Sequence, residues 1–260
     1  MPVTYSSYLK IDELLALQQP LSDGPEHDEM LFIVIHQVYE LWFKEMIHEL
    51  EFLVNELQGV EVARAQHTLK RVLTILKVLV HQIDILETMT PLEFLSFRER
   101  LESGSGFQSL QFRELEFLLG NKRPEAVKRY EEGTPARVRL ERRFNSPTLW
   151  DAFLRYLSGR GHAVPAGALR RDVTQIPAAD PSLHPLLVQV YRTDQDARAI
   201  CERLVDLDEG LMEWRYRHVK MVERTIGTRR GTGGSAGAGY LKTTLDQPLF
   251  PDLWQIRTEL

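Results

Sequence analysis

The sequence contains a single cysteine among its 260 residues, which excludes an internal disulfide and any cysteine-rich zinc site. Cys201 stands in the apolar pattern of residues 197–205, where a buried structural thiol is far commoner than a nucleophile. An excess of positive charge is missing as well, because the formal net charge is −5. Neither nucleic acid nor an anionic membrane surface is therefore an expected partner.

Long apolar runs are also absent from the sequence. No run approaches the roughly 18 residues that a membrane-spanning helix needs, and residues 1–8 lack the basic-then-apolar layout of a signal peptide. We therefore expect no membrane insertion and a cytoplasmic location. With 43% hydrophobic residues, the chain can nevertheless bury a substantial core.

Alternating strand patterns are nearly absent, whereas apolar residues recur every three or four positions almost throughout. This periodicity predicts long helices over residues 26–57 and 61–86, with a break at residues 55–59 in which Gly59 is the C′ residue after the first helix. It also predicts a pair of long helices over residues 185–226. The expected fold is all-α: one domain over residues 1–260, built as a bundle of long antiparallel helices without significant sheet.

Thr90 and Glu93 form a capping-box pattern that predicts another helix start. That helix is expected to end in the glycine-containing residues 102–106. Residues 120–180 are predicted to form a smaller helical insertion, in which residues 158–167 are the expected flexible connection.

A histidine stands in the middle of residues 32–44, a segment too apolar for a surface helix. Phe32, His36, Tyr39 and Phe43 are spaced by four, three and four residues, so they share one helix face. An unpaired buried imidazole costs roughly 1–3 kcal/mol, and His36 must therefore find a backbone carbonyl, a metal or a ligand. A core histidine paired with a carbonyl is the commoner case, and the segment alone leaves the choice open.

The eight histidines of the chain form no His-x-x-x-His or Glu-x-x-His pair of the kind that binds zinc or di-iron. His48, His67 and His81 lie among charged helix positions and are expected to be solvated. His218 instead shares a face with Trp214 and further apolar residues of its helix. Such a face suits a proximal haem ligand, but it also suits a core histidine with a protein partner.

The glycine-rich residues 231–237 loosely fit a dinucleotide-binding fingerprint. That fingerprint requires a preceding strand, whereas a basic helical segment precedes these residues. We therefore reject a nucleotide site and predict a mobile lid that closes on a ligand. Arg98 could hold a carboxylate with both nitrogens of its fork, although most helix arginines simply lie on the surface.

Several long blocks of the chain, from Tyr5 to the C-terminus, together resemble the haem-dependent tryptophan 2,3-dioxygenase family. The blocks are residues 4–9, 32–44, 97–99, 105–113, 216–218, 231–237 and 240–241.

The resemblance implies that the enzyme oxidises L-tryptophan with O2 to N-formyl-L-kynurenine, using one ferrous haem b per subunit. His218 is implied as the axial ligand of the haem iron. His36 would lie on the opposite, distal side as the catalytic residue, where it accepts a hydrogen bond from the indole N–H. Arg98 would bind the substrate carboxylate, and Thr232 the ammonium and carboxylate end.

Further substrate-binding residues are implied in the same way. Phe32 and Phe94 would pack on the indole. The residues between Phe32 and His36 are also implied to bind the substrate: Ile33, Val34 and Ile35. The family resemblance implies a homotetramer in which residues 1–20 form an arm. Residues of this arm would complete the site of a neighbouring subunit: Tyr5, Tyr8 and Leu9. The helix around His218 also supplies candidates for pairing with the haem propionates: Arg215, Arg217, Lys220 and Arg224.

Two positions depart from the usual family pattern. Phe94 stands where several bacterial relatives have tyrosine, and Ala236 stands where a second serine is usual. Two other functions remain as alternatives. One is a related haem enzyme that hydroxylates an aromatic amino acid, and the other is a non-catalytic helical haem-binding protein.

Overall fold

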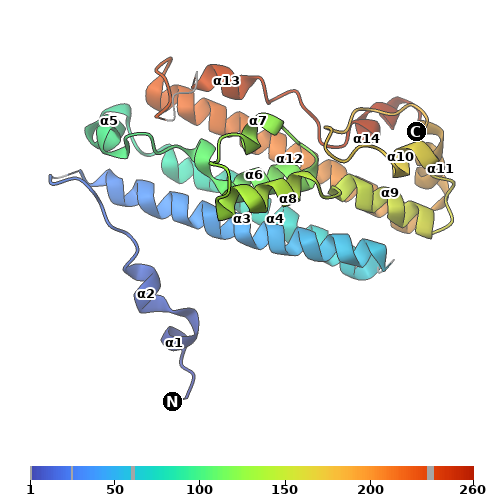
Figure 1. The fold of residues 1–260 in the computed structure, drawn as a ribbon, viewed down its shortest axis with the longest axis horizontal. Coiled ribbons are helices and arrows are strands. Elements are labelled where there is room, and N and C mark those ends of the chain that lie inside the picture. Colours follow the sequence, from blue (N-terminus) through green and yellow to red (C-terminus); the bar gives the residue numbers. More distant parts are fainter. Residues whose placement is uncertain (1, 25, 60–61, 233–236) are drawn as a thin grey trace.

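The computed structural model describes residues 2–24, 26–59, 62–232 and 237–260. Every regular element within these ranges is helical, which confirms the predicted all-α class. Three long helices lie side by side and form the centre of the molecule (Figure 1). They are α3 (Asp28–Gln58), α4 (Val62–Leu86) and α12 (Gln195–Ile226).

The long helices are not all antiparallel. A short connection joins α3 to α4, and these two helices run in opposite directions (Figure 1). By contrast, α12 follows the direction of α4, because Gly210 packs against Leu76 and Arg217 Nη2 lies 2.5 Å from Asp84 Oδ1. The predicted antiparallel bundle is therefore wrong for this second pair. The shorter helices between α4 and α12 return the chain to the far end before α12 begins.

Gly210 explains why α4 and α12 can pack so closely. A Cβ atom at this position would lie 2.8 Å from Leu76 Cδ2, well inside normal contact distance. Glycine costs roughly 1 kcal/mol relative to alanine within a helix, so it is placed here for close packing rather than for helix formation.

Helix ends follow the sequence signals in part. The capping box predicted for α5 (Pro91–Phe97) is present, since Thr90 N donates to Glu93 Oε2 over 2.6 Å and Glu93 N donates to Thr90 Oγ1 over 3.4 Å. The helix then tightens into the 3₁₀ segment η1 (Arg98–Leu101). The predicted helix end at Gly59 is confirmed, but this residue is the C-cap of α3 with a φ of −78° and not a left-handed C′ residue.

The predicted long pair over residues 185–226 is one short helix, α11 (His184–Thr193), followed by the long α12. Asp194 separates the two, because its side chain accepts a hydrogen bond from Ala197 N and caps α12. Shorter elements complete the described fold: α6 (Leu110–Leu119), α7 (Pro124–Val127), α8 (Pro135–Phe144), α9 (Leu149–Gly159), α10 (Ala166–Leu169), α13 (Ala238–Lys242), α14 (Pro251–Gln255) and the 3₁₀ segments η2 (Gly106–Gln108) and η3 (Ile256–Thr258).

Residues 158–167, the expected flexible connection, are tied to the start of α12. Arg160 donates from Nε and Nη2 to the two carboxylate oxygens of Asp194 over 2.8 and 2.9 Å. His162 Nε2 lies 2.9 Å from the same carboxylate. The segment is therefore held by three polar contacts and is not a free linker.

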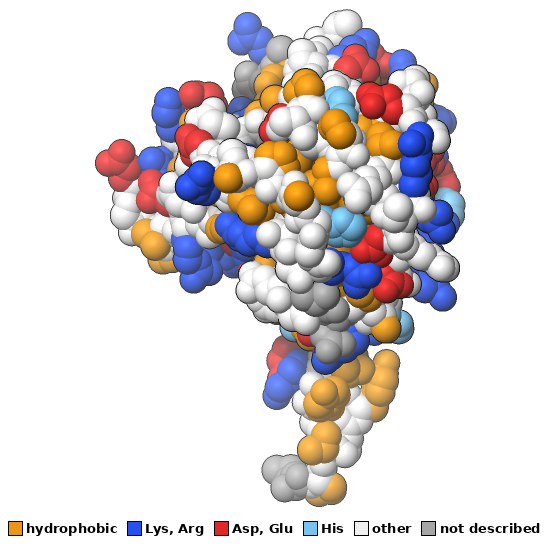
Figure 2. Space-filling view, turned by 90° about the vertical axis from the view of Figure 1, so that its right-hand side faces the viewer, with side chains coloured by type: hydrophobic (Ala, Val, Ile, Leu, Met, Phe, Trp, Pro, Cys, Tyr) orange, Lys and Arg blue, Asp and Glu red, His pale blue; other side chains and the backbone are white. Residues whose placement is uncertain are grey.

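The N-terminal helices α1 (Tyr5–Leu9) and α2 (Ile11–Leu15) project from the body and bury none of their residues (Figure 1). Hydrophobic side chains lie along this projection (Figure 2). Tyr5 is 78% exposed, Tyr8 75% and Leu15 70%, values that leave these side chains without packing partners in their own chain. Separately, none of the helices that the structure describes is both long and apolar enough to span a membrane.

Candidate active site

A cavity of about 270 Å³ lies between α3 and α12, and residues of α5, α6 and α13 complete its walls. This volume is near the lower end of the range of about 300–1,000 Å³ typical of small-molecule pockets. The four residues predicted to share one face of α3 all line the cavity, which confirms that part of the sequence analysis: Phe32, His36, Tyr39 and Phe43.

His36 reaches the cavity from α3 and hydrogen-bonds to its own helix. Its Nδ1 lies 2.7 Å from the carbonyl oxygen of Phe32, one turn earlier. Because a carbonyl only accepts, Nδ1 must carry the proton, and Nε2 of the neutral ring is left as an acceptor. Burial lowers the pKa of His36, so the neutral form prevails at pH 7. The carbonyl partner is thus present and selects the tautomer, although the side chain of His36 is exposed and is not part of the core.

His218 reaches the same cavity from α12. Its ring stacks on Trp214 with a centroid distance of 5.3 Å and an interplanar angle of 4°. Within the part of the chain that the structure describes, neither ring nitrogen has a hydrogen-bond partner. Burial, with smaller effects from His36 and Arg113, lowers the pKa of His218 to about 4. The imidazole is therefore neutral at pH 7 and has a nitrogen available to a metal ion.

Aromatic rings form much of the remaining wall. Phe32 lies 5.8 Å from Phe94 and 5.5 Å from Phe97, measured between ring centroids. On the other side of the cavity, Trp214 lies 5.2 Å from Phe112, and its indole nitrogen is buried without a hydrogen-bond partner in the described part of the chain. These rings offer flat apolar surfaces on which another aromatic system can pack.

Arg98 and Thr232, the two residues predicted to bind the amino-acid end of a substrate, both line the cavity. Arg98 Nη2 donates to the carbonyl of Arg230 over 2.5 Å, and Thr232 Oγ1 donates to the carbonyl of Gly104 over 2.5 Å. These two bonds fasten the start of the glycine-rich segment over the cavity. The expectation for Ala236 falls at residues 233–236, which lie outside the described part of the chain.

Other predicted site residues lie elsewhere. The cavity lining does not include Ile33, Val34 or Ile35: Ile35 is buried in the main core, and Val34 points outward with 38% of its surface exposed. This placement follows from helix geometry, because consecutive residues cannot share the face that carries Phe32 and His36. The arm residues also lie away from the cavity of their own chain: Tyr5, Tyr8 and Leu9.

Outside the cavity, the three histidines predicted to be solvated are all exposed: His48, His67 and His81. Of the four basic residues proposed for haem propionates, Arg215 alone lines the cavity. Arg217 pairs with Asp84 and Glu87, and Lys220 pairs with Glu223, so these two side chains have partners on the helix surface.

A buried ionic cluster in the cavity wall, centred on Glu116 of α6, was not predicted from the sequence. Arg113 Nη1 lies 2.5 Å and Arg123 Nη2 2.7 Å from Glu116 Oε2. Asn121 Nδ2 donates to the other carboxylate oxygen over 3.3 Å, and Arg215 Nη2 lies 3.7 Å from it. A signal was present in the sequence, since Arg113 and Glu116 are opposite charges spaced by three residues on one helix.

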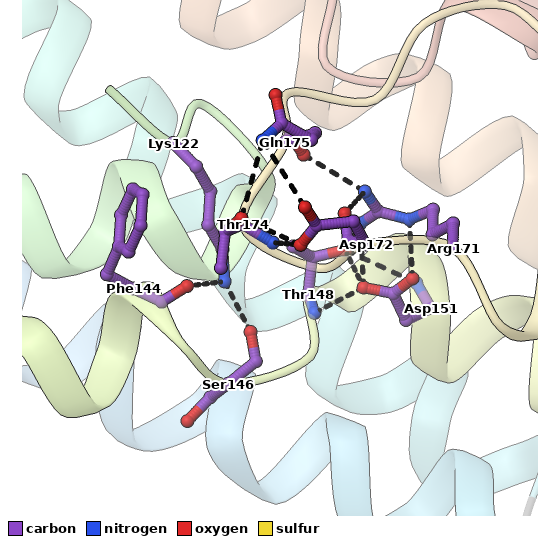
Figure 3. A network of polar contacts seen from close by, with 9 residues as sticks. All are labelled: Lys122, Phe144, Ser146, Thr148, Asp151, Arg171, Asp172, Thr174 and Gln175. Atoms are coloured by element: carbon purple, nitrogen blue, oxygen red, sulfur yellow. Dashed lines mark hydrogen bonds and ion pairs between the residues drawn. The ribbon is translucent and has the colours of Figure 1, made fainter. Parts of the chain in front are cut away.

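The cluster is connected to the segment that follows the glycine-rich residues. Arg123 Nη1 donates to the hydroxyl oxygen of Tyr240 over 2.5 Å, and Tyr240 belongs to α13. Behind Arg123, the buried Lys122 donates to the carbonyl oxygens of Phe144 (2.7 Å) and Ser146 at the end of α8 (Figure 3). These bonds fix the turn that carries Arg123 into the cavity.

Beside Lys122, a second network holds the chain around Asp151 (Figure 3). Asp151 accepts hydrogen bonds from Thr148 and a bidentate pair from Arg171, with Nε–Oδ1 and Nη2–Oδ2 distances of 2.6 and 2.7 Å. None of these three residues lines the cavity, so this network supports the fold behind the site.

Comparison with known proteins identifies the family of the chain. The sequence model of the family described as tryptophan 2,3-dioxygenase matches residues 1–145 and 178–260. A protein of Herpetosiphon aurantiacus named tryptophan 2,3-dioxygenase is 58% identical over 258 residues, which covers 99% of this chain and 98% of the relative. Proteins of the same name from Anaeromyxobacter sp. (strain K) and Xanthomonas euvesicatoria are 54% and 44% identical, covering 99% of this chain and 96% and 88% of their own lengths. The chain belongs to the tryptophan 2,3-dioxygenase family.

Proposed function

We propose that the protein is a haem-dependent dioxygenase that cleaves the indole C2–C3 bond of L-tryptophan with O2. The product is N-formyl-L-kynurenine, which makes the reaction the first step of tryptophan degradation by the kynurenine route. The observation that carries the proposal is the pairing of His36 and His218, which face one aromatic cavity from α3 and α12 while Arg98 and Thr232 stand at its edge.

The residues of the cavity fit a haem b group. His218 offers a neutral nitrogen without a protein partner, and most of the surrounding wall is hydrocarbon or aromatic, as a porphyrin requires. His218 would hold the iron. When bound, ferrous haem supplies the binding and activation of O2.

His36 would orient the substrate. With its Nδ1 proton held by the Phe32 carbonyl, Nε2 can accept a hydrogen bond from the indole N–H. The indole nitrogen is a very weak acid, so this contact positions the ring and need not remove the proton. Phe32 and Phe94 provide surfaces on which the indole packs.

Arg98 and Thr232 would bind the amino-acid end. The guanidinium fork of Arg98 is suited to a bidentate carboxylate pair, and the Thr232 hydroxyl can accept from an ammonium group or donate to a carboxylate. Both side chains now donate to backbone carbonyls of the segments that border the cavity, so the substrate would replace these partners.

The exposed arm supports an assembly of several chains. Tyr5, Tyr8 and Leu9 belong to helices that bury nothing in their own chain, and they would complete the site of a neighbouring subunit in a homotetramer. A large exposed apolar surface of this kind is typical of an interface. We place the enzyme in the cytoplasm, as one folded domain over residues 1–260.

The test is an absorption spectrum of the ferrous protein with and without L-tryptophan, followed by product analysis after O2 is added. We expect a histidine-ligated haem spectrum that tryptophan perturbs, and N-formylkynurenine as the product. A hydroxylated amino acid would instead support the related hydroxylase. Haem binding without tryptophan-dependent O2 uptake would support a non-catalytic haem-binding protein.

A further inference from the structure

The cavity wall carries an unbalanced positive charge. The cavity is lined by four guanidinium groups and two carboxylates, which together have a net charge of +2: Arg98, Arg113, Arg123, Arg215, Glu40 and Glu116. Burial of unpaired charge is expensive, so a cavity of this composition calls for an anionic ligand.

The excess is concentrated around Glu116. Arg113 is 6% exposed, Arg215 5% and Glu116 3%, and three guanidinium groups contact this one carboxylate. Asp208, which does not line the cavity, is a further buried carboxyl that acts electrostatically on Arg215. Burial lowers the pKa of both Arg113 and Arg215, which reflects the cost of keeping their charges out of water. Arginine nevertheless remains protonated in proteins, so the cluster keeps its surplus charge.

Several N–H groups of the cluster are also unsatisfied. Within the described residues, Arg113 Nε, Arg123 Nε and Arg215 Nη2 are buried without a hydrogen-bond partner. A buried donor that has no acceptor in the protein must be satisfied by water or by a ligand, and the place of these three donors beside the cavity favours a ligand that is an acceptor. Unpaired donors on three different arginines point to more than one acceptor group.

We propose that Arg113, Arg123 and Arg215 form a cradle for the two propionate carboxylates of the cofactor, with Glu116 as the counter-charge that holds the three arginines together. The inference rests on the proposed haem dependence and deepens it. Ferrous haem b has a neutral iron–porphyrin core and two carboxylates, and its charge of −2 balances the +2 of the wall. Tryptophan, as a zwitterion on Arg98 and Thr232, adds no net charge.

The site for the substrate carboxylate is distinct from this cradle. Arg98 comes from η1 and contacts the carbonyl of Arg230, whereas Arg113 and Arg123 come from α6 and the turn after it and contact Glu116. The cradle and the substrate end therefore use different arginines, which makes their effects separable.

The experiment compares two cofactors that differ only in these charges. The full chain is titrated, by absorption, with haem and with haem dimethyl ester, whose esters keep the porphyrin and iron but remove both negative charges. The measured quantity is the dissociation constant of the dimethyl ester divided by that of haem, so a higher ratio means a stronger preference for haem. The wild type should favour haem, and Arg113→Met or Arg215→Met should reduce that preference by at least about tenfold, because a hydrogen-bonded charge pair is lost.

Glu116→Gln gives a prediction of opposite sign. Removing this carboxylate raises the surplus charge of the wall, so the preference for haem over its dimethyl ester should increase. Loss of packing or partial unfolding would weaken both cofactors alike and could not raise the ratio. Arg217→Met is the matched control, because this arginine lies on α12 near Arg215 but pairs with Asp84 and Glu87 on the surface, and its ratio should equal that of the wild type.

If Arg113→Met and Arg215→Met fail to fold, Arg123→Met provides the same test, since its side chain is 20% exposed and less deeply packed. A wild type that binds haem and its dimethyl ester equally would overturn the cradle while leaving haem dependence intact. An unchanged ratio in the arginine variants, or a lower ratio in Glu116→Gln, would also overturn it. Failure of the wild type to bind haem at all would refute the proposed function itself.

Discussion

The hydrogen bond between the His36 ring and the carbonyl of Phe32 gives this side chain two properties at once. It satisfies Nδ1, and it leaves Nε2 as the acceptor that the proposed indole contact needs. His36→Ala should therefore weaken tryptophan binding or slow turnover by a few-fold to about tenfold, the value of one hydrogen bond of roughly 0.5–1.5 kcal/mol.

Steady-state kinetics of His36→Ala with L-tryptophan provide the measurement, with haem content determined on the same sample. Complete loss of turnover with haem and substrate still bound would contradict an orienting role. It would show that His36 acts as an obligatory base.

His218 makes the stability of the haem-free protein depend on pH. The unfolded chain protonates this residue near the ordinary value of 6.5, whereas the folded protein does so near 4. Between these values the unfolded state binds more protons, so the free energy of unfolding should fall as the pH is lowered from about 6.5 to about 4.

Urea denaturation at pH 7 and pH 4.5 measures this dependence. His218→Ala should show a weaker decrease than the wild type over the same interval, and it should also fail to bind haem stably. His48→Ala, at an exposed position of α3, is the control and should retain the wild-type decrease. If the free energy of unfolding fell equally in His218→Ala and the wild type, His218 would not be the source of the pH dependence.

Arg98 can be tested through the substrate group that it is proposed to bind. Arg98→Leu should raise the KM for L-tryptophan steeply, since removal of one partner of a buried charge pair costs about 2–5 kcal/mol. Tryptamine lacks the carboxylate, so its KM should change far less. Arg100→Leu, which removes a neighbouring arginine paired only loosely with Asp23 at 3.9 Å, should leave both constants unaltered. An unchanged preference for tryptophan over tryptamine in Arg98→Leu would exclude it as the carboxylate partner.

At the scale of single elements, the start of α12 depends on Asp194. Burial by itself raises the pKa of this carboxyl, but hydrogen bonds from Arg160, His162 and Ala197 N more than offset that effect, and the pKa lies well below its usual value. Asp194→Ala should lower the free energy of unfolding by about 2–4 kcal/mol, because it removes a helix cap and leaves Arg160 without its main partner.

Asp194→Asn separates the two contributions, since asparagine still caps a helix but has no charge. It should be more stable than Asp194→Ala at pH 7. The ion-pair contribution is complete above the unfolded pKa of about 3.8 and is lost as the pH falls below it, so the difference between the wild type and Asp194→Asn should narrow in acid. If the stability difference between the wild type and Asp194→Asn did not change with pH, the charge of Asp194 would make no contribution to stability.

Elements differ in how far the sequence predicts them. The periodicity of α3 and α4 and the capping box of α5 are local signals, and the structure confirms them. The parallel course of α12 beside α4 could not be predicted, because nothing local records how the intervening helices turn the chain.

Within the site, too, local patterns could be predicted from the sequence and contacts between distant segments could not. Phe32, His36, Tyr39 and Phe43 were recognisable because one helix face carries them all. The Glu116 cluster draws Arg113 and Arg123 from α6 and the turn that follows it, but Arg215 comes from α12, far along the sequence. Charged residues on separate helices have no spacing from which their convergence can be predicted.

At the scale of the whole molecule, the arm should be dispensable for folding but not for function. α1 and α2 bury no residues, so deletion of residues 2–16 should leave the thermal unfolding of the single chain nearly unchanged. If Tyr5, Tyr8 and Leu9 complete a neighbouring site, the deletion should raise the KM for tryptophan and weaken assembly, as measured by kinetics and sedimentation.

A mixing experiment makes this prediction specific. A chain with the arm deleted has intact His36 and His218, and a His218→Ala chain has an intact arm, so each is inactive or impaired alone. Mixed assemblies should recover activity, because arms from one kind of chain complete the sites of the other. No recovery in mixed assemblies that sedimentation shows to have formed would exclude a shared site.

The bonds from Arg98 to the Arg230 carbonyl and from Thr232 to the Gly104 carbonyl mean that substrate binding is an exchange. If Arg98 and Thr232 bind the amino-acid end, tryptophan must displace two existing acceptors, and its carboxylate then contributes to affinity only as far as it is a better acceptor than a peptide oxygen. A ligand with a neutral group in that place has little advantage over the carbonyls it would displace. Such an exchange would disfavour indoles without a charged tail, even where the aromatic walls would accept their rings.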